Sequence, residues 1–506
     1  MAIQRGLDTN HEQDPRLLLR DTRTLMQRAK DFFNEPKNSS MLLIVAIVMC
    51  FFFKAFADLF FFISLIIFLY SYSSHTKLPF RMPKRSNLLD WNDLQPGSDK
   101  PKPKKAGGIF FIGNKKLSNE ELWFNNADMR THVLIFGSTG AGKTETLLSF
   151  GYNALIQCSG MIYIDGKGDN SLFSKIFSMA RTLGREDDVL LINFMTGAKD
   201  IIGPQQTKLS NTLNPFCQGS SSMLSQLVVS LMDKGSNSGD GDMWKGRAIG
   251  FVESLMRVLV YLRDQGRILL DANVIRKYFE LRLLEPIYID RKFILSDSET
   301  IDLKKELNIP DIVLEPLDNY IINLPGYNRA RQGKQVSQVL EQHGFITMQL
   351  TRVFTSLADT YGHILRTNLA EVDLKDVVLN RRILVVLLPA LEKSPDELAS
   401  LGKVIIATLK AMMASGLGES VEGSYEDLIL RKPTNSPTPF VCILDEYGYY
   451  AVEGFAVVPA QARSLGFSVI FAGQDLPALQ KASKEEAASI GANTNIKIAM
   501  KIEYPV

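Results

Sequence analysis

Residues 137–144 constrain the fold of this 506-residue chain more than any other feature. They read GSTGAGKT, which matches the P-loop pattern G-x-x-x-x-G-K-[ST], and they lie between a short apolar run and helix formers at 145–156. Glycines let backbone N–H groups close on phosphates, and a following helix N-terminus favours anions. In such a loop the lysine reaches the β- and γ-phosphates and the last hydroxyl binds Mg²⁺. The predicted phosphate-binding residues are Gly137, Ser138, Thr139, Gly140, Ala141, Gly142, Lys143 and Thr144, with Thr144 also a metal ligand.

A carboxylate is needed to complete the metal centre. Residues 440–446, FVCILDE, supply acidic side chains at the end of an apolar run. We expect Asp445 to hold Mg²⁺, usually through water, and Glu446 to orient and deprotonate the attacking water. The alternative is an ordinary pair of acidic residues at a strand end. Because a hydrolytic water needs a base and no guanine-reading N-K-x-D follows the P-loop, the pattern favours ATP hydrolysis over phosphate transfer or GTP switching.

The chain beyond residue 106 alternates short apolar runs with helical patterns, which predicts an α/β domain with a parallel-rich central sheet. This alternation fails between about 220 and 376, where the apolar spacing is helical and no strand is convincing. We therefore expect an all-α domain inserted into the α/β domain. The predicted strands are 132–136, 160–165, 189–194, 383–388, 440–445, 467–472 and 495–500.

Residues 41–72 are almost wholly apolar, interrupted by Lys54 and Asp58. One helix of that length exceeds the roughly 30 Å hydrocarbon core of a bilayer, so we predict a transmembrane hairpin that turns between these two charges. A single tilted span, with Lys54 and Asp58 paired on one helix, is the alternative. Both flanks are basic, and the positive-inside rule then places the N-terminus and the α/β domain in the cytoplasm.

The stretch after the hairpin is rich in proline and lysine, which predicts an extended tether that touches anionic lipid headgroups. The last predicted strand lies directly before the end of the chain, so we expect the sequence to stop short of the domain's natural end. The predicted domains are an N-terminal cytoplasmic segment (1–38), the transmembrane hairpin (39–75), the linker (76–106), the first part of the nucleotide-binding domain (107–219), the inserted domain (220–376) and the second part (377–506).

Composition excludes several other classes. The formal net charge of +2 gives no whole-chain signature of a nucleic-acid binder. The four cysteines are far apart and form no CxxC pair, so they indicate neither a zinc site nor a disulfide framework. The five histidines are scattered, without the spacing of a nucleophilic triad.

Together these motifs resemble the type IV coupling proteins, membrane-anchored hexameric ATPases of the RecA-like class that includes the FtsK and HerA DNA pumps, and most of all the coupling proteins of Dot/Icm type IVB secretion systems. Residues 164–169, IDGKGD, resemble the family's D-x-K-G-[DE] signature near the nucleotide. Arg463 and Gln474 match the positions of its arginine finger, which acts across a subunit interface, and of its γ-phosphate-sensing glutamine. A surface salt bridge is the alternative for Arg463.

The resemblance implies a RecA-like P-loop ATPase with ATP and Mg²⁺ as cofactors, located in the bacterial inner membrane. It implies self-association into a ring, contacts with inner-membrane and adaptor subunits of the secretion system, and effector proteins as cargo. Two other functions stay open. A DNA pump shares every catalytic residue, although the basic residues of the predicted insertion are interleaved with acidic ones, which disfavours tracking along phosphates. The other is a non-catalytic scaffold whose assembly is stabilised by bound nucleotide.

Overall fold

The computed structural model describes residues 24–34, 36–73, 81–95, 102–116, 119–197, 209–232, 239–296, 298–415, 435–452, 454–455, 457–480 and 483–501, together with 422, 424 and 426. The chain divides into two compact units. One comprises residues 1–108 and 113–123, and the other comprises residues 109–112 and 124–506. The predicted N-terminal segment lies largely outside the described residues.

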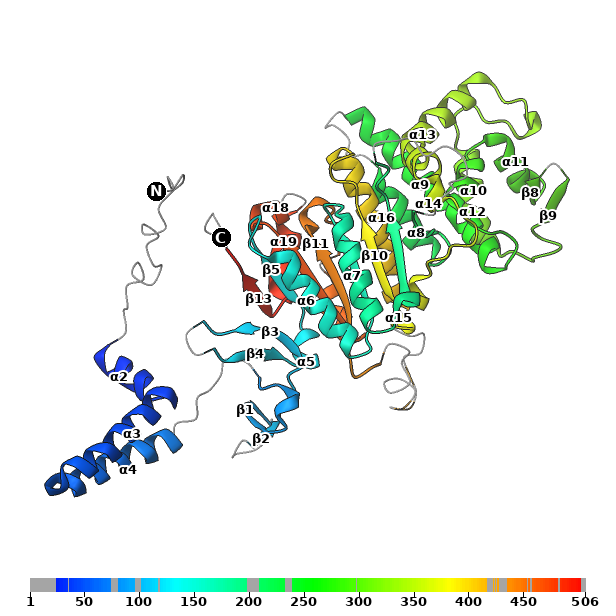
Figure 1. Ribbon diagram of the computed structural model, residues 1–506. Coiled ribbons are helices and arrows are strands. Elements are labelled where there is room, and N and C mark those ends of the chain that lie inside the picture. Colours follow the sequence, from blue (N-terminus) through cyan, green and yellow to red (C-terminus); the bar gives the residue numbers. More distant parts are fainter. Residues whose placement is uncertain are drawn as a thin grey trace, which may run out of the picture. The chain divides into compact units, whose positions relative to one another are not determined.

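The first unit begins with three helices, α2 (Leu25–Asn34), α3 (Pro36–Phe52) and α4 (Ala57–Ser73), and α3 packs along α4 (Figure 1). A single 3₁₀ turn, Lys54–Phe56, separates α3 from α4, at the position where the sequence predicts a turn. No described helix is by itself long and apolar enough to cross a bilayer. The segments Asn38–Phe52 and Lys54–Leu69 meet that test only as a pair, by length and composition, with a 120° bend between them. Membrane crossing therefore stays a prediction.

Part of the predicted linker is folded, which corrects the expectation of an extended tether. Strand β1 (Leu89–Leu94) pairs antiparallel with β2 (Pro103–Lys105). The buried Asp90 carboxylate accepts hydrogen bonds from the backbone N–H groups of Met82 (2.6 Å) and Asn92 (2.9 Å), so polar contacts stabilise a segment with little apolar content. Two further strands, β3 (Phe110–Asn114) and β4 (Glu121–Phe124), form another two-stranded sheet.

The second unit contains a seven-stranded sheet whose strands are all parallel and lie in the order β13-β5-β12-β11-β6-β10-β7. Each strand coincides with a predicted one, so the parallel sheet is confirmed. One strand, β12, separates the P-loop strand β5 from β11, which carries Asp445, and this is the RecA-like form of the P-loop fold. The strands are β5 (Val133–Phe136), β6 (Met161–Asp165), β7 (Val189–Asn193), β10 (Ile383–Leu387), β11 (Phe440–Asp445), β12 (Phe467–Gly473) and β13 (Ile496–Ala499).

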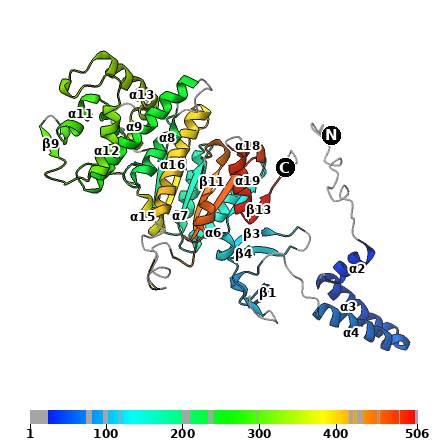
Figure 2. The ribbon, with the colours of Figure 1, turned by 180° about the vertical axis from the view of Figure 1, so that it is seen from behind.

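Helices cover both faces of this sheet because successive side chains of each buried strand point to opposite sides. Ile135, Tyr163 and Ile443 share one apolar core with helices α6 (Lys143–Ile156) and α7 (Asn170–Thr182). The alternate strand residues belong to the core on the other face, with α16 (Pro395–Ser415) and α17 (Val457–Ala462) (Figures 1 and 2). Three other helices of this unit are α5 (Asn126–Met129), α18 (Leu476–Gln480) and α19 (Lys484–Asn493).

The segment between β7 and β10 is mostly helical, as predicted, but it is not entirely α. Strands β8 (Lys292–Ser296) and β9 (Glu299–Asp302) form an antiparallel hairpin in which Phe293 faces Ile301, and both side chains are buried. The Phe293 ring stacks on Tyr278 with centroids 4.4 Å apart, which joins the hairpin to the helical core. The helices are α8 (Ser221–Leu231), α9 (Gly239–Asp264), α10 (Ala272–Lys277), α11 (Leu281–Ile289), α12 (Asp311–Ile322), α13 (Ser337–Thr355), a π-helix (Ser356–Thr360), α14 (Gly362–Leu365) and α15 (Leu374–Leu379). The predicted domain boundaries stay predictions.

Gly402 on α16 marks a close approach of this helix to the loop after β11. A Cβ at this position would lie 2.2 Å from the Cβ of the buried Tyr450. We expect Gly402→Ala to lower the free energy of unfolding by about 1–3 kcal/mol, since overpacking outweighs the gain of up to ~1 kcal/mol in helix propensity. Gly246→Ala on α9 is the matched control, because nothing lies within 4 Å of its added Cβ and it should be neutral or stabilising. Thermal unfolding of the two variants measures the difference, and equal stabilities would contradict the packing argument.

Candidate nucleotide-binding site

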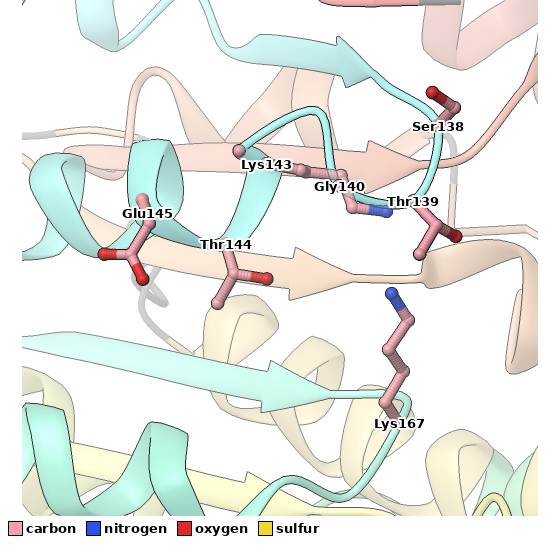
Figure 3. Close-up of a pocket in the computed structure, with 8 residues that line it drawn as sticks. Ser138, Thr139, Gly140, Lys143, Thr144, Glu145 and Lys167 are labelled. Atoms are coloured by element: carbon pink, nitrogen blue, oxygen red, sulfur yellow. The ribbon is translucent and has the colours of Figure 1, made fainter. Parts of the chain in front are cut away.

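The P-loop joins the end of β5 to the start of α6, as the motif predicts. Gly140 and Gly142 have φ angles of +81° and +86°, which glycine adopts without strain. The loop surrounds a pocket of about 250 Å³. In Figure 3 the Lys143 side chain runs beneath the loop, whereas Glu145 points away from it. The pocket is lined by Ser138, Thr139, Gly140, Gly142, Lys143, Thr144, Glu145 and Lys167.

Asp445 and Glu446, predicted as metal ligand and base, lie beside the P-loop lysine. The buried Lys143 Nζ is 2.6 Å from Glu446 Oε1 and 3.7 Å from Asp445 Oδ1. Glu446 has a φ of +52°, a left-handed conformation that turns the chain sharply at the end of β11. The sheet therefore brings together residues about 300 positions apart in the sequence, and the carboxyl ends of β5 and β11 meet at one edge.

A second lysine belongs to this cluster: Lys167, whose segment the resemblance places near the nucleotide but for which the sequence predicts no role. Lys167 Nζ lies 2.7 Å from the same Glu446 oxygen that Lys143 contacts. It extends from the turn after β6, and Figure 3 shows its amine pointing toward the P-loop. The motif at 164–169, in which a lysine follows a strand-end aspartate and glycine, indicates the place of Lys167 but not its contact with Glu446.

Burial and charge act differently on the two carboxylates after β11. Burial raises the pKa of Asp445 to about 6. The positive charge of Lys143 opposes this increase, whereas the negative charges of Glu446 and Asp165 add to it. Burial would also raise the pKa of Glu446, but hydrogen bonds from Lys143 and Lys167 outweigh it and lower the pKa below its ordinary value. Tyr163 OH donates to Asp445 Oδ2 (3.2 Å) and fixes the orientation of that carboxylate.

The residues at this edge suit a magnesium ion that is held largely by phosphate and water. Thr144 offers a hydroxyl at the start of α6, and Asp445 offers a buried carboxylate at the end of β11. Among the described residues, no three histidine, cysteine, aspartate or glutamate side chains gather at one point. Mg²⁺ commonly binds one or two protein oxygens together with phosphates and waters, so the donor set fits this ion.

Gln474 and Arg463 lie at opposite ends of strand β12. Gln474 follows β12 directly, next to the P-loop, where Gly137 N–H donates to Gly473 O (3.2 Å). Arg463 precedes β12 and is exposed, at the edge where the parallel strands begin. The structure therefore brings Gln474 to the edge that carries Lys143, Thr144, Asp445 and Glu446, but separates Arg463 from the P-loop of the same chain.

Comparisons with known proteins agree with the motifs. No family model matches the chain. The Type 4 coupling protein DotL of Legionella pneumophila is 69% identical over 503 residues, covering 99% of this chain and 64% of the relative, so the chain spans less than two thirds of that protein's length.

Solved structures of the coupling protein TrwB also match the chain. One, with sulphate, has a TM-score of 0.46 and 13% identity over 84% of this chain and 80% of that one. Another, with ADP and Mg²⁺, has a TM-score of 0.45 and 11% identity over 76% and 73%. At these scores the likeness supports no conclusion about function. Over 503 residues, the sequence of this chain is similar to that of the Type 4 coupling protein DotL.

Proposed function

We propose that this chain is the ATP-hydrolysing part of an inner-membrane coupling protein that receives effector proteins and passes them to a type IV secretion channel. The observation that supports it best is that Lys143 Nζ lies 2.6 Å from Glu446 Oε1, the candidate base, and 3.7 Å from Asp445 Oδ1, the candidate metal ligand. ATP is the nucleotide we propose, because a base next to the P-loop suits hydrolysis by water.

In this proposal each residue of the cluster has a separate task. The P-loop backbone and Lys143 bind the β- and γ-phosphates, and Thr144 and Asp445 hold Mg²⁺, which neutralises charge that develops on the phosphates. Glu446 takes the proton of the attacking water once its carboxylate is released from Lys143. Gln474 contacts the γ-phosphate from the end of β12.

Assembly and membrane attachment extend the proposal. Arg463, at the edge opposite the P-loop, would reach the nucleotide of a neighbouring subunit, so turnover would require a ring, which we expect to be hexameric. Helices α3 and α4 would form a hairpin through the inner membrane, with the ATPase in the cytoplasm and lipid headgroups against the basic linker. Adaptor and inner-membrane subunits of a Dot/Icm-type system would bind the assembled ring.

The proposal is tested by the ATPase rate of the full chain in detergent as protein concentration increases. We expect a specific rate that increases with concentration, because an interface-dependent site forms only on assembly, and that does not respond to single-stranded or duplex DNA. Stimulation by DNA of several-fold would instead favour a DNA translocase. Nucleotide binding without turnover at any concentration would favour the scaffold.

A further inference from the structure

Lys167 is a basic residue of the pocket lining to which the proposed mechanism gives no task. Its ammonium and that of Lys143 contact the same carboxylate oxygen, Glu446 Oε1, at 2.7 and 2.6 Å. Both side chains line the pocket beneath the P-loop. Two ammonium groups therefore reach the same point, and one bound anion in this pocket would be within reach of both.

The backbone that carries Lys167 is held firmly. The Asp165 carboxylate accepts hydrogen bonds from the N–H of Lys167 (2.9 Å) and the N–H of Asp169 (2.7 Å), and it is buried. Gly166 N–H donates to the Asp445 carbonyl oxygen (3.2 Å), which ties this turn to the end of β11. The Lys167 side chain is 42% exposed, so its four methylene groups can rotate while the backbone stays in place.

Without a bound anion, the two lysines of this cluster stay paired with its two carboxylates. The carboxylates of Asp445 and Glu446 face the ammonium groups of Lys143 and Lys167. Both ammonium groups contact the same oxygen, Glu446 Oε1, so two charged partners hold this carboxylate. This oxygen becomes available to another partner once both lysines have moved to another anion.

We propose that Lys167 is a γ-phosphate ligand that moves from Glu446 to the terminal phosphate of a nucleoside triphosphate, so that the site distinguishes ATP from ADP and frees Glu446 only when ATP is bound. The inference rests on the proposed function. Lys143 alone would leave Glu446 tied to Lys167, whereas the transfer of both lysines releases the carboxylate and neutralises the added phosphate charge.

Nucleotide binding, without turnover, tests this proposal. Binding of fluorescent ADP and of a fluorescent non-hydrolysable ATP analogue is measured with Mg²⁺ on the full chain in detergent. Lys167→Met is expected to lower the preference for the ATP analogue over ADP by about tenfold or more, the effect of one charge-assisted hydrogen bond, while ADP affinity changes little. Lys167→Arg should restore most of the preference. Lys175→Met is the matched control, because Lys175 pairs with Glu145 and does not line the pocket.

A double-mutant cycle separates the transfer from a simple loss of charge. Glu446→Gln should strengthen binding of the ATP analogue, because neither lysine then leaves a carboxylate. Lys167→Met should remove much of that gain if Lys167 moves between the two partners. An equal loss of ADP and analogue affinity in Lys167→Met, or no loss of either, would overturn the inference. Failure of the wild-type chain to bind either nucleotide would instead overturn the proposed function itself.

Discussion

Replacing Glu446 with glutamine is expected to lower the ATPase rate by about 10²- to 10⁴-fold, the usual contribution of a general base, while nucleotide binding persists. Glutamine keeps the size of the side chain and loses the proton acceptor. The ion pairs of Glu446 with Lys143 and Lys167 are lost at the same time, so both lysines are available to phosphate. Turnover and binding of the same preparation should therefore change in opposite directions.

The matched control for this variant is Glu186→Gln. Glu186 is exposed in the 3₁₀ turn before β7 and is absent from the pocket lining, so its ATPase rate should equal that of the wild type. If Glu446→Gln retained more than about a tenth of the wild-type rate, Glu446 would not be the base, given the contribution expected of one. If it lost binding as well as turnover, its contact with Lys143 would have to be structural.

The central sheet could be predicted because its strands are buried on both faces and are therefore short, uninterrupted apolar runs. The run 383–388 is an example, since every residue of β10 is buried. The P-loop could be predicted equally well, because its chemistry depends on local backbone geometry and a fixed order of residues. The positions of Asp445 and Glu446 could be predicted because parallel strands place their carboxyl ends, and so the P-loop and the end of β11, at the same edge of the sheet.

Features that depend on distant contacts could not be predicted. The β8–β9 hairpin has one residue of each strand fully inside the core, Phe293 and Ile301, which is too short a pattern to separate from helical spacing. The β1–β2 pair depends on the buried Asp90, whose hydrogen bonds no apolar pattern indicates. The motif that contains Lys167 is recognisable in the sequence, but the contact of Lys167 with Glu446, 279 positions away in the sequence, exists only because β6 and β11 are neighbours in the sheet.

The position of Arg463 leads to the second large effect. Because β12 is parallel to β5 and Arg463 precedes β12, the arginine lies a strand length from the P-loop of its own subunit. In the proposed mechanism it therefore acts on the nucleotide of a neighbouring subunit. Loss of an arginine finger lowers the rate by about 10³- to 10⁵-fold where measured, so we expect Arg463→Ala to be nearly inactive in turnover but normal in nucleotide binding. Arg181→Ala, an exposed arginine at the end of α7, is the matched control.

Mixing two inactive variants distinguishes action between subunits from action within one. Lys143→Ala subunits lack a functional P-loop but keep Arg463. Arg463→Ala subunits keep the P-loop but lack the arginine. In a mixed ring, the interface between the P-loop of the second variant and the arginine of the first is intact, so ATPase activity should reappear on mixing. If the mixture stays as inactive as its components, Arg463 does not act across the interface. If Arg463→Ala alone has the wild-type rate, Arg463 is a surface residue, and the subunit-dependent part of the proposed mechanism is wrong.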